Sequence, residues 1–134
     1  MNALVTIHEA SRRTGVNPKM IRHYESIGLI APPQRGENRY RRYGEHDLQE
    51  LALIRRARDL GFSIGDIRHL LVLWRDRGRS SAEVKAIAQR HIAALEEKAA
   101  ALQAMTETLK RLAARCPGDN RPDCPILNAL DVLR

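Results

Sequence analysis

The longest stretch of the chain without glycine or proline covers residues 79–116 and lies between Gly78 and Pro117. Ser80 near its start and Glu83 three residues later have the pattern of a capping box, which typically opens a helix. A helix of more than thirty residues would extend about 50 Å, at about 1.5 Å per residue. That is farther than a small domain can cover, so this segment needs a partner helix.

The same segment carries a repeat in alternating steps of four and three residues. This spacing predicts the contact face of a coiled coil, here with two polar interruptions. The positions are Val84, Ala88, His91, Leu95, Lys98, Leu102, Met105, Leu109 and Leu112. A second copy of the chain is the economical partner, and we expect a homodimer through an antiparallel coiled coil.

The N-terminal segment carries the start and stop signals of two short helices. Residues Thr6–Glu9 have the form of a capping box, and Gly15 can end the first helix in a left-handed conformation. Asn17 followed by Pro18 is a favourable start for a second helix, which continues to Gly28. Two short helices joined by a glycine-containing turn predict a helix-turn-helix.

A basic segment follows these two helices. Residues 39–43 alternate like a short strand after a Gly-Glu-Asn turn, which predicts a small hairpin, or wing, beside the helix-turn-helix. Eight Lys or Arg residues stand against two acidic residues between positions 12 and 42, within a chain of net charge +7. This excess favours a nucleic-acid partner, although charge alone is explained equally well by a solvated basic surface.

Both cysteines, Cys116 and Cys124, flank a loop near the C-terminus. Pro117 ends the long helix and Pro125 favours a new short one, so each thiol stands at a helix boundary. The loop between them can fold back and bring the two sulfur atoms together.

We expect the chain to lie in the cytoplasm. No apolar run approaches the roughly 20 residues that span a bilayer, and the first residues lack the pattern of a secretory signal. In that compartment thiols bind metals or undergo redox chemistry more often than they form structural disulfides. No phosphate loop, HExxH motif or catalytic triad is present in the sequence, so we do not expect an enzyme.

Two thiolates suit a soft monovalent ion that accepts two ligands, namely Cu(I), and by the same reasoning Ag(I) or Au(I). Zinc usually takes four ligands, and the nearest histidine, His91, lies about seven helical turns from Cys116. Asp119 and Asp123 could add oxygen donors. A disulfide-based redox switch and a metal store or metallochaperone remain open alternatives.

Several phrases of the chain together resemble the MerR family of transcriptional regulators: RHYESIGLI, NRYRRY, ARDLGFSIGDIRHLL and the long helix after them. The terminal CPGDNRPDCPIL resembles the metal-binding loop of the copper-responsive, CueR-like branch. The resemblance implies a homodimer on a palindromic promoter element. Cu(I) binding would let RNA polymerase transcribe genes for copper, silver or gold efflux and detoxification.

The resemblance also implies roles for individual residues. It implies that DNA is contacted by Lys19, Arg22 and Tyr24 of the second helix and by Arg35, Tyr40 and Arg41 of the wing. As an alternative to DNA contact, the two tyrosines could pack the wing onto the second helix. Ser81 takes the position where divalent-metal sensors of the family carry a third cysteine, although it can equally serve to cap the long helix.

The expected fold is therefore mainly α, in three parts. Residues 1–75 form a winged helix-turn-helix DNA-binding domain with connecting helices. Residues 80–115 form the dimerisation helix, and residues 116–134 form the metal-binding loop with a short terminal helix.

Overall fold

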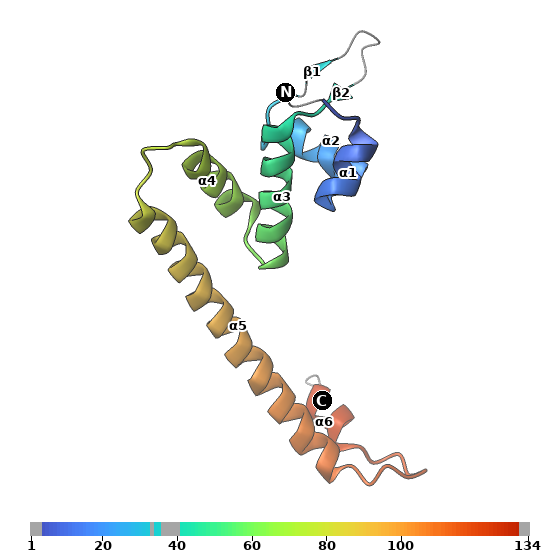
Figure 1. Ribbon diagram of the computed structural model, residues 1–134. Helices are drawn as coiled ribbons and strands as arrows, with labels where there is room; N and C mark the ends of the chain where they lie inside the picture. The colour runs from blue at the N-terminus through green and yellow to red at the C-terminus, as the bar shows by residue number, and fades with distance from the viewer. Residues whose placement is uncertain (1–3, 33, 36–40, 132–134) are drawn as a thin grey trace. The chain divides into compact units, whose positions relative to one another are not determined.

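The computed structural model describes residues 4–32, 34–35 and 41–131. Within them the chain forms six helices and one small two-stranded sheet (Figure 1). It divides into two compact units, which we call the N-terminal unit (residues 1–87) and the C-terminal unit (residues 88–134). The mainly α fold predicted from the sequence is confirmed.

Helix α1 spans Ile7–Thr14 and begins as the sequence predicts. The backbone N–H of Glu9 donates to the hydroxyl of Thr6 at 3.2 Å, and Gly15 ends the helix with φ of 78°. The carboxylate of Glu9 was expected to complete the capping box, but it accepts hydrogen bonds from Arg12 instead. The hydrogen bond to the hydroxyl of Thr6 is therefore sufficient to define this helix start.

Helix α2 spans Pro18–Ser26 and is the second helix of the helix-turn-helix. The side chain of Asn17 accepts a hydrogen bond from the backbone N–H of Met20 at 2.8 Å. Gly28, with φ of 73°, follows the end of the helix in a conformation that side chains with a Cβ rarely adopt. Both boundaries therefore arise from local signals.

Strands β1 (Gln34–Arg35) and β2 (Arg41–Arg42) form the base of the predicted wing. They pair antiparallel, with Gln34 opposite Arg42 and Arg35 opposite Arg41. The segment that joins them, which includes Tyr40, lies outside the described residues.

Helices α3 (Glu45–Asp59) and α4 (Ile64–Arg75) complete the N-terminal unit. Helix α3 packs against both α1 and α4, and α1 packs against α2 (Figure 1). All four helices contribute to one apolar core, whose buried members are Ala10, Val16, Ile21, Tyr24, Leu29, Ile30, Tyr43, Leu48, Leu51, Ile54, Ala57, Ile67 and Leu71. This core fixes the orientation of α2 within the unit.

Helix α5 spans Ser81–Arg115 and has 35 residues, in agreement with the predicted long helix. The hydroxyl of Ser80 accepts from the N–H of Ala82 at 3.2 Å. The carboxylate of Glu83, expected to complete a capping box, instead lies 3.2 Å from His69 of α4. Ile87 is almost fully buried, so the first two turns of α5 belong to the N-terminal unit.

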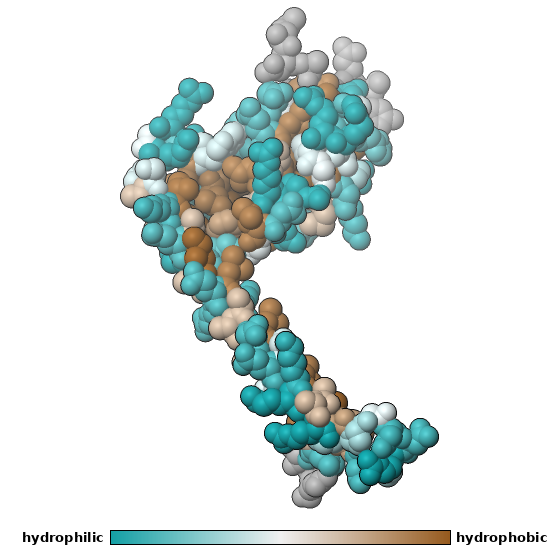
Figure 2. Space-filling view, turned by 60° about the horizontal axis from the view of Figure 1, so that its bottom comes forward, coloured by the Kyte–Doolittle hydropathy of each residue, from teal (hydrophilic) through white to brown (hydrophobic). Residues whose placement is uncertain are grey.

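Beyond Ile87, helix α5 exposes large apolar side chains. Ile92, Leu95, Leu102, Met105 and Leu109 are between 42% and 62% exposed. Figure 2 shows hydrophobic residues among hydrophilic ones along this helix. Helix α6 (Pro125–Leu130) is the last helix of the described residues. None of the described helices has the length and apolarity needed to cross a membrane.

Candidate metal centre and nucleic-acid interface

The two cysteines lie together in the C-terminal unit. Cys116 follows the last residue of α5, and Cys124 is the N-cap residue of α6. Their sulfur atoms are 3.9 Å apart, and both thiols are free and partly buried. Gly118, with φ of 67°, helps the connecting loop turn back. The chain thus brings its two soft donors within reach of one ion.

The start of α6 favours the ionised form of Cys124. The backbone N–H of Leu127 is the main cause that lowers the pKa of Cys124 below its ordinary value. Partial burial opposes this effect, while the N–H of Ile126 and the thiol of Cys116 add to it. Pro125 contributes no N–H at this helix start, so the next two amides stabilise the sulfur. A thiolate is the form that binds metals.

Other candidate donors do not converge on this pair. The carboxylate of Asp119 is held by Arg121, whose backbone and side-chain N–H groups both donate to it at 2.9 Å. Among residues 4–32, 34–35 and 41–131, no group of three or more His, Cys, Asp or Glu side chains is arranged to hold a metal ion. Ser81 is the exposed first residue of α5.

Helix α2 presents basic side chains on its surface. Lys19 and Arg22 are exposed, and residues three apart lie on the same side of a helix. Tyr24 is only 4% exposed and belongs to the core, which favours its alternative packing role over direct contact with DNA. Lys19 and Arg22 are therefore the two accessible residues of the set predicted on α2.

The wing is attached to α2 through Tyr43, a residue to which the sequence analysis assigned no role. Tyr43 follows β2, is 1% exposed, and forms an isolated bridge with Val5. Its hydroxyl donates to the carboxylate of Glu25 on α2 at 2.5 Å. The alternation of residues 39–43 places a tyrosine at the inner end of the strand, a signal that could have identified this contact. Arg35 and Arg41 lie in β1 and β2.

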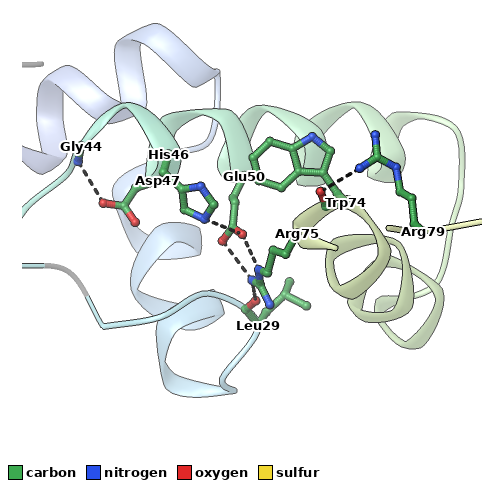
Figure 3. A network of polar contacts seen from close by, with 8 residues as sticks. All are labelled: Leu29, Gly44, His46, Asp47, Glu50, Trp74, Arg75 and Arg79. Atoms are coloured by element: carbon green, nitrogen blue, oxygen red, sulfur yellow. Dashed lines mark hydrogen bonds and ion pairs between the residues drawn. The ribbon is translucent and has the colours of Figure 1, made fainter. Parts of the chain in front are cut away.

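A buried carboxylate on α3 was also missed. Glu50 is 2% exposed and accepts two hydrogen bonds from Arg75, the last residue of α4 (Figure 3). Arg75 also donates to the carbonyl oxygen of Leu29 at 3.1 Å, and His46 lies 3.1 Å from Glu50. The hydrogen bonds that Arg75 donates to Glu50 raise the pKa of Arg75 above its ordinary value. No local sequence signal identifies this network, because its members are separated by up to 46 residues.

This arrangement of a capped helix pair, a wing and a long helix defines a class of DNA-binding regulators. Residues 5–73 match the model of the MerR HTH family regulatory protein, and residues 48–112 match the model described as MerR, DNA binding. The chain belongs to the MerR family of helix-turn-helix regulatory proteins. It is a DNA-binding transcription regulator and not an enzyme, as the sequence predicted.

The names of individual relatives are consistent with membership of this family. The chain is 58% identical over 126 residues to "Heavy metal-dependent transcription regulator 2" of Rhizobium meliloti (strain 1021), covering 94% of this chain and 86% of the relative. It is 41% identical to the HTH-type transcriptional regulator CueR of Salmonella typhimurium, covering 94% and 91% of the two chains. Among solved structures, it resembles the transcription regulator PbrR691 from Ralstonia metallidurans CH34 in complex with lead(II). That match has a TM-score of 0.81 and 34% identity, and it covers 94% of this chain and 98% of the other.

Proposed function

We propose that this chain is a metal-responsive transcriptional activator that binds promoter DNA as a homodimer and whose effector is Cu(I). Cys116 and Cys124 would hold the ion, and Ag(I) and Au(I) would be alternative effectors. The observation that carries the proposal is the free thiol pair, with sulfur atoms 3.9 Å apart. The names of two relatives, a heavy metal-dependent regulator and a CueR, support the same class of function.

The geometry of the pair fits one shared ion. Its sulfur separation is less than twice a metal–thiolate bond of about 2.3 Å, the value typical of zinc. A linear arrangement with bonds of that length needs about 4.6 Å between the sulfur atoms. Binding of a linear ion therefore requires the pair to open by several tenths of an ångström.

The donor set favours a monovalent ion. Two thiolates and one monovalent ion carry one net negative charge, which the amides at the start of α6 partly offset. A soft divalent ion would require a further thiolate or imidazole. Ser81 offers only a hydroxyl where, by family resemblance, divalent-metal sensors carry a cysteine.

The proposal of a dimer rests on the apolar side chains that α5 exposes. Beyond the N-terminal unit this helix exposes Leu95, Leu102, Met105 and Leu109, which follow the heptad spacing. Exposed apolar side chains at this spacing are stabilised by burial against a second helix. A second copy of the chain, running antiparallel, provides the same spacing.

On DNA, we propose that Lys19 and Arg22 of α2 and Arg35, Tyr40 and Arg41 of the wing contact the duplex. Basic side chains neutralise phosphates, which supplies much of the affinity in protein–DNA binding. Tyr24 would support this surface from the core. The complex would act in the cytoplasm, where RNA polymerase transcribes metal efflux and detoxification genes from the bound promoter.

An anaerobic Cu(I) titration against a competing chelator tests the metal site. We expect one ion per chain to bind tightly to the reduced protein. The Cys116→Ser variant should lose this binding, because one thiolate alone cannot hold the ion in competition. Zn(II) is the matched control and should not compete with Cu(I) for the pair.

The same titration tests a second function, thiol–disulfide sensing. The two free sulfur atoms are close, and the lowered pKa of Cys124 favours the reactive thiolate. Weak Cu(I) binding combined with ready, reversible disulfide formation would replace the metal proposal with a redox sensor. Tight Cu(I) binding without specific binding to promoter DNA would instead indicate a metal store or chaperone.

A further inference from the structure

Helix α4 holds the C-terminal end of the DNA-reading helix α2 through two arginines. Arg68 donates to the carbonyl oxygens of Ile27 and Gly28 at 3.0 and 3.1 Å. Arg75 donates to the next carbonyl oxygen, that of Leu29, at 3.1 Å. Three consecutive carbonyls after α2 are thus bound by one neighbouring helix.

The chemistry of both contacts favours arginine. The three carbonyl groups lie in the turn that follows α2, where a backbone oxygen has to find a partner outside the helix. A guanidinium group has several N–H donors in a fixed planar arrangement, so Arg68 can bind two adjacent carbonyls at once. A lysine has a single nitrogen and cannot reproduce this two-point contact with the same geometry.

The second contact is held in place from α3. Both carboxylate oxygens of Glu50 accept hydrogen bonds from Arg75, and the Glu50 side chain is 3% exposed (Figure 3). His46 approaches the same carboxylate at 3.1 Å. Because Glu50 is fixed by burial, Arg75 can reach Leu29 only in a narrow range of orientations.

Two separated contacts restrict rotation more than one contact does. Arg68 and Arg75 are seven residues apart, which places them on the same face of α4, about 10 Å apart along its axis. The core already holds α2 through the buried Ile21 and Tyr24, and a single further contact would leave more freedom for small tilts than two contacts do. Together they fix the direction of α2 relative to α4.

Helix α4 is in turn attached to the start of α5. His69 lies 3.2 Å from Glu83 in the first turn of α5, and the buried Ile87 anchors the second turn in the N-terminal unit. A continuous set of contacts therefore runs from the end of α2, through α4, to the first turns of the long helix.

We propose that Arg68 and Arg75 are positioning residues that determine which spacing of DNA half-sites the dimer accepts. The inference rests on the proposed function, because it requires a homodimer formed through α5 that reads two half-sites. In such a dimer the half-site spacing is a geometric consequence of how each reading helix is held. Without these contacts α2 is held by the core alone, and each α2 can tilt slightly toward a wrong spacing, so discrimination falls while the DNA contacts themselves remain.

The test uses DNA duplexes selected by the wild-type dimer from a random library. One or two base pairs are then inserted or deleted between the half-sites, and binding is measured by fluorescence anisotropy. We expect the wild type to lose at least about tenfold in affinity on a two-base-pair change, in the range of a mismatched site. The Arg68→Ala variant should bind the best duplex within about threefold of wild type. The spacing preference is the logarithm of the ratio between the affinities for the best duplex and for a duplex with altered spacing. In the Arg68→Ala variant it should be less than half of the wild-type value.

Arg55→Ala is the matched control. Arg55 of α3 donates to the carbonyl oxygen of Gly15 at the end of α1, so it caps a helix end in the same way without involving α4. Its removal should leave the spacing preference unchanged. Arg68→Lys keeps the charge and the aliphatic stem, and it is the replacement variant if thermal melting shows that Arg68→Ala is unfolded. We expect its spacing preference to fall between those of Arg68→Ala and the wild type.

The inference is overturned if the folded Arg68 variants keep the wild-type spacing profile. It is also overturned if Arg55→Ala relaxes the profile equally, or if the wild type itself tolerates all spacings. A wild-type protein that selects no duplex with two related half-sites would contradict the proposed dimeric DNA binding instead, and the inference would fall with it.

Discussion

At the scale of single residues, Cys124 differs from an ordinary surface thiol because of its place at a helix start. The amides of Leu127 and Ile126 point at its sulfur and lower its pKa. At neutral pH a larger fraction of Cys124 is therefore thiolate, and fewer protons must be displaced when an ion binds. In the proposed metal site, the position of this thiol would contribute directly to metal affinity.

This account predicts the pH dependence of thiol alkylation in the Cys116→Ser variant, where Cys124 is the sole thiol. A lowered pKa increases the thiolate fraction below the ordinary midpoint of about 8.5, and the difference disappears at higher pH, where all thiols are ionised. The rate of reaction with iodoacetamide should therefore reach half-maximum at a lower pH in the folded protein than in the unfolded chain. In concentrated urea the midpoint should rise to the ordinary value. Identical midpoints in buffer and in urea would contradict the prediction.

Residue-scale chemistry was only partly predictable from the sequence. The cysteine pair could be predicted because both thiols stand at proline-marked helix boundaries within one short loop. The burial of Tyr24 could not be derived from its neighbours, because it depends on how α2 packs in the core. The Glu50–Arg75–Leu29 network was missed for the same reason, since it joins three separate elements.

At the scale of elements, the starts of α1, α2 and α4 are each set by a single capping side chain. Asn17 caps α2 with a hydrogen bond of 2.8 Å from Met20, and Ser63 caps α4 with one of 3.1 Å from Asp66. These signals are local in the sequence, so the helix starts could be predicted. The carboxylates of Glu9 and Glu83 could not be assigned in this way, because other partners compete for a mobile charged side chain.

We expect Asn17→Ala to lower the free energy of unfolding by about 1 kcal/mol, because the N–H of Met20 loses its acceptor. Urea denaturation monitored by circular dichroism measures this difference. Asn17→Asp retains an acceptor oxygen at the same position and should stay close to wild type. If the alanine and aspartate variants are equally stable, the cap does not contribute as described.

At the scale of the whole molecule, the exposed apolar face of α5 is the main unsatisfied feature of a single chain. The heptad spacing made it visible in the sequence, and Leu102 is 62% exposed in the structure. A free chain with this surface would be prone to association. Dimerisation through α5 would bury the face and bring two DNA-reading units into one particle.

Replacing Leu102 with glutamate should therefore disrupt the dimer. Burying one leucine contributes about 1.5–3 kcal/mol of free energy. In a two-fold symmetric dimer the substitution occurs at two places in the interface, so this contribution is lost twice. We expect the dissociation constant of the dimer to rise at least about a hundredfold, measured by light scattering after size-exclusion chromatography. Ala100→Glu places the same charge about 200° away around the helix and should leave the dimer intact. Monomers in both variants, or in neither, would contradict the proposed interface.

The proposed activation of transcription by Cu(I) bound to Cys116 and Cys124 can be measured by transcription in vitro. Purified protein, RNA polymerase and a promoter selected by the protein are combined under anaerobic conditions, with and without Cu(I). We expect more transcript with Cu(I), no increase with Zn(II), and no response to either ion in the Cys116→Ser variant. Transcript levels that do not change with Cu(I), or that rise equally with Zn(II), would contradict the proposal.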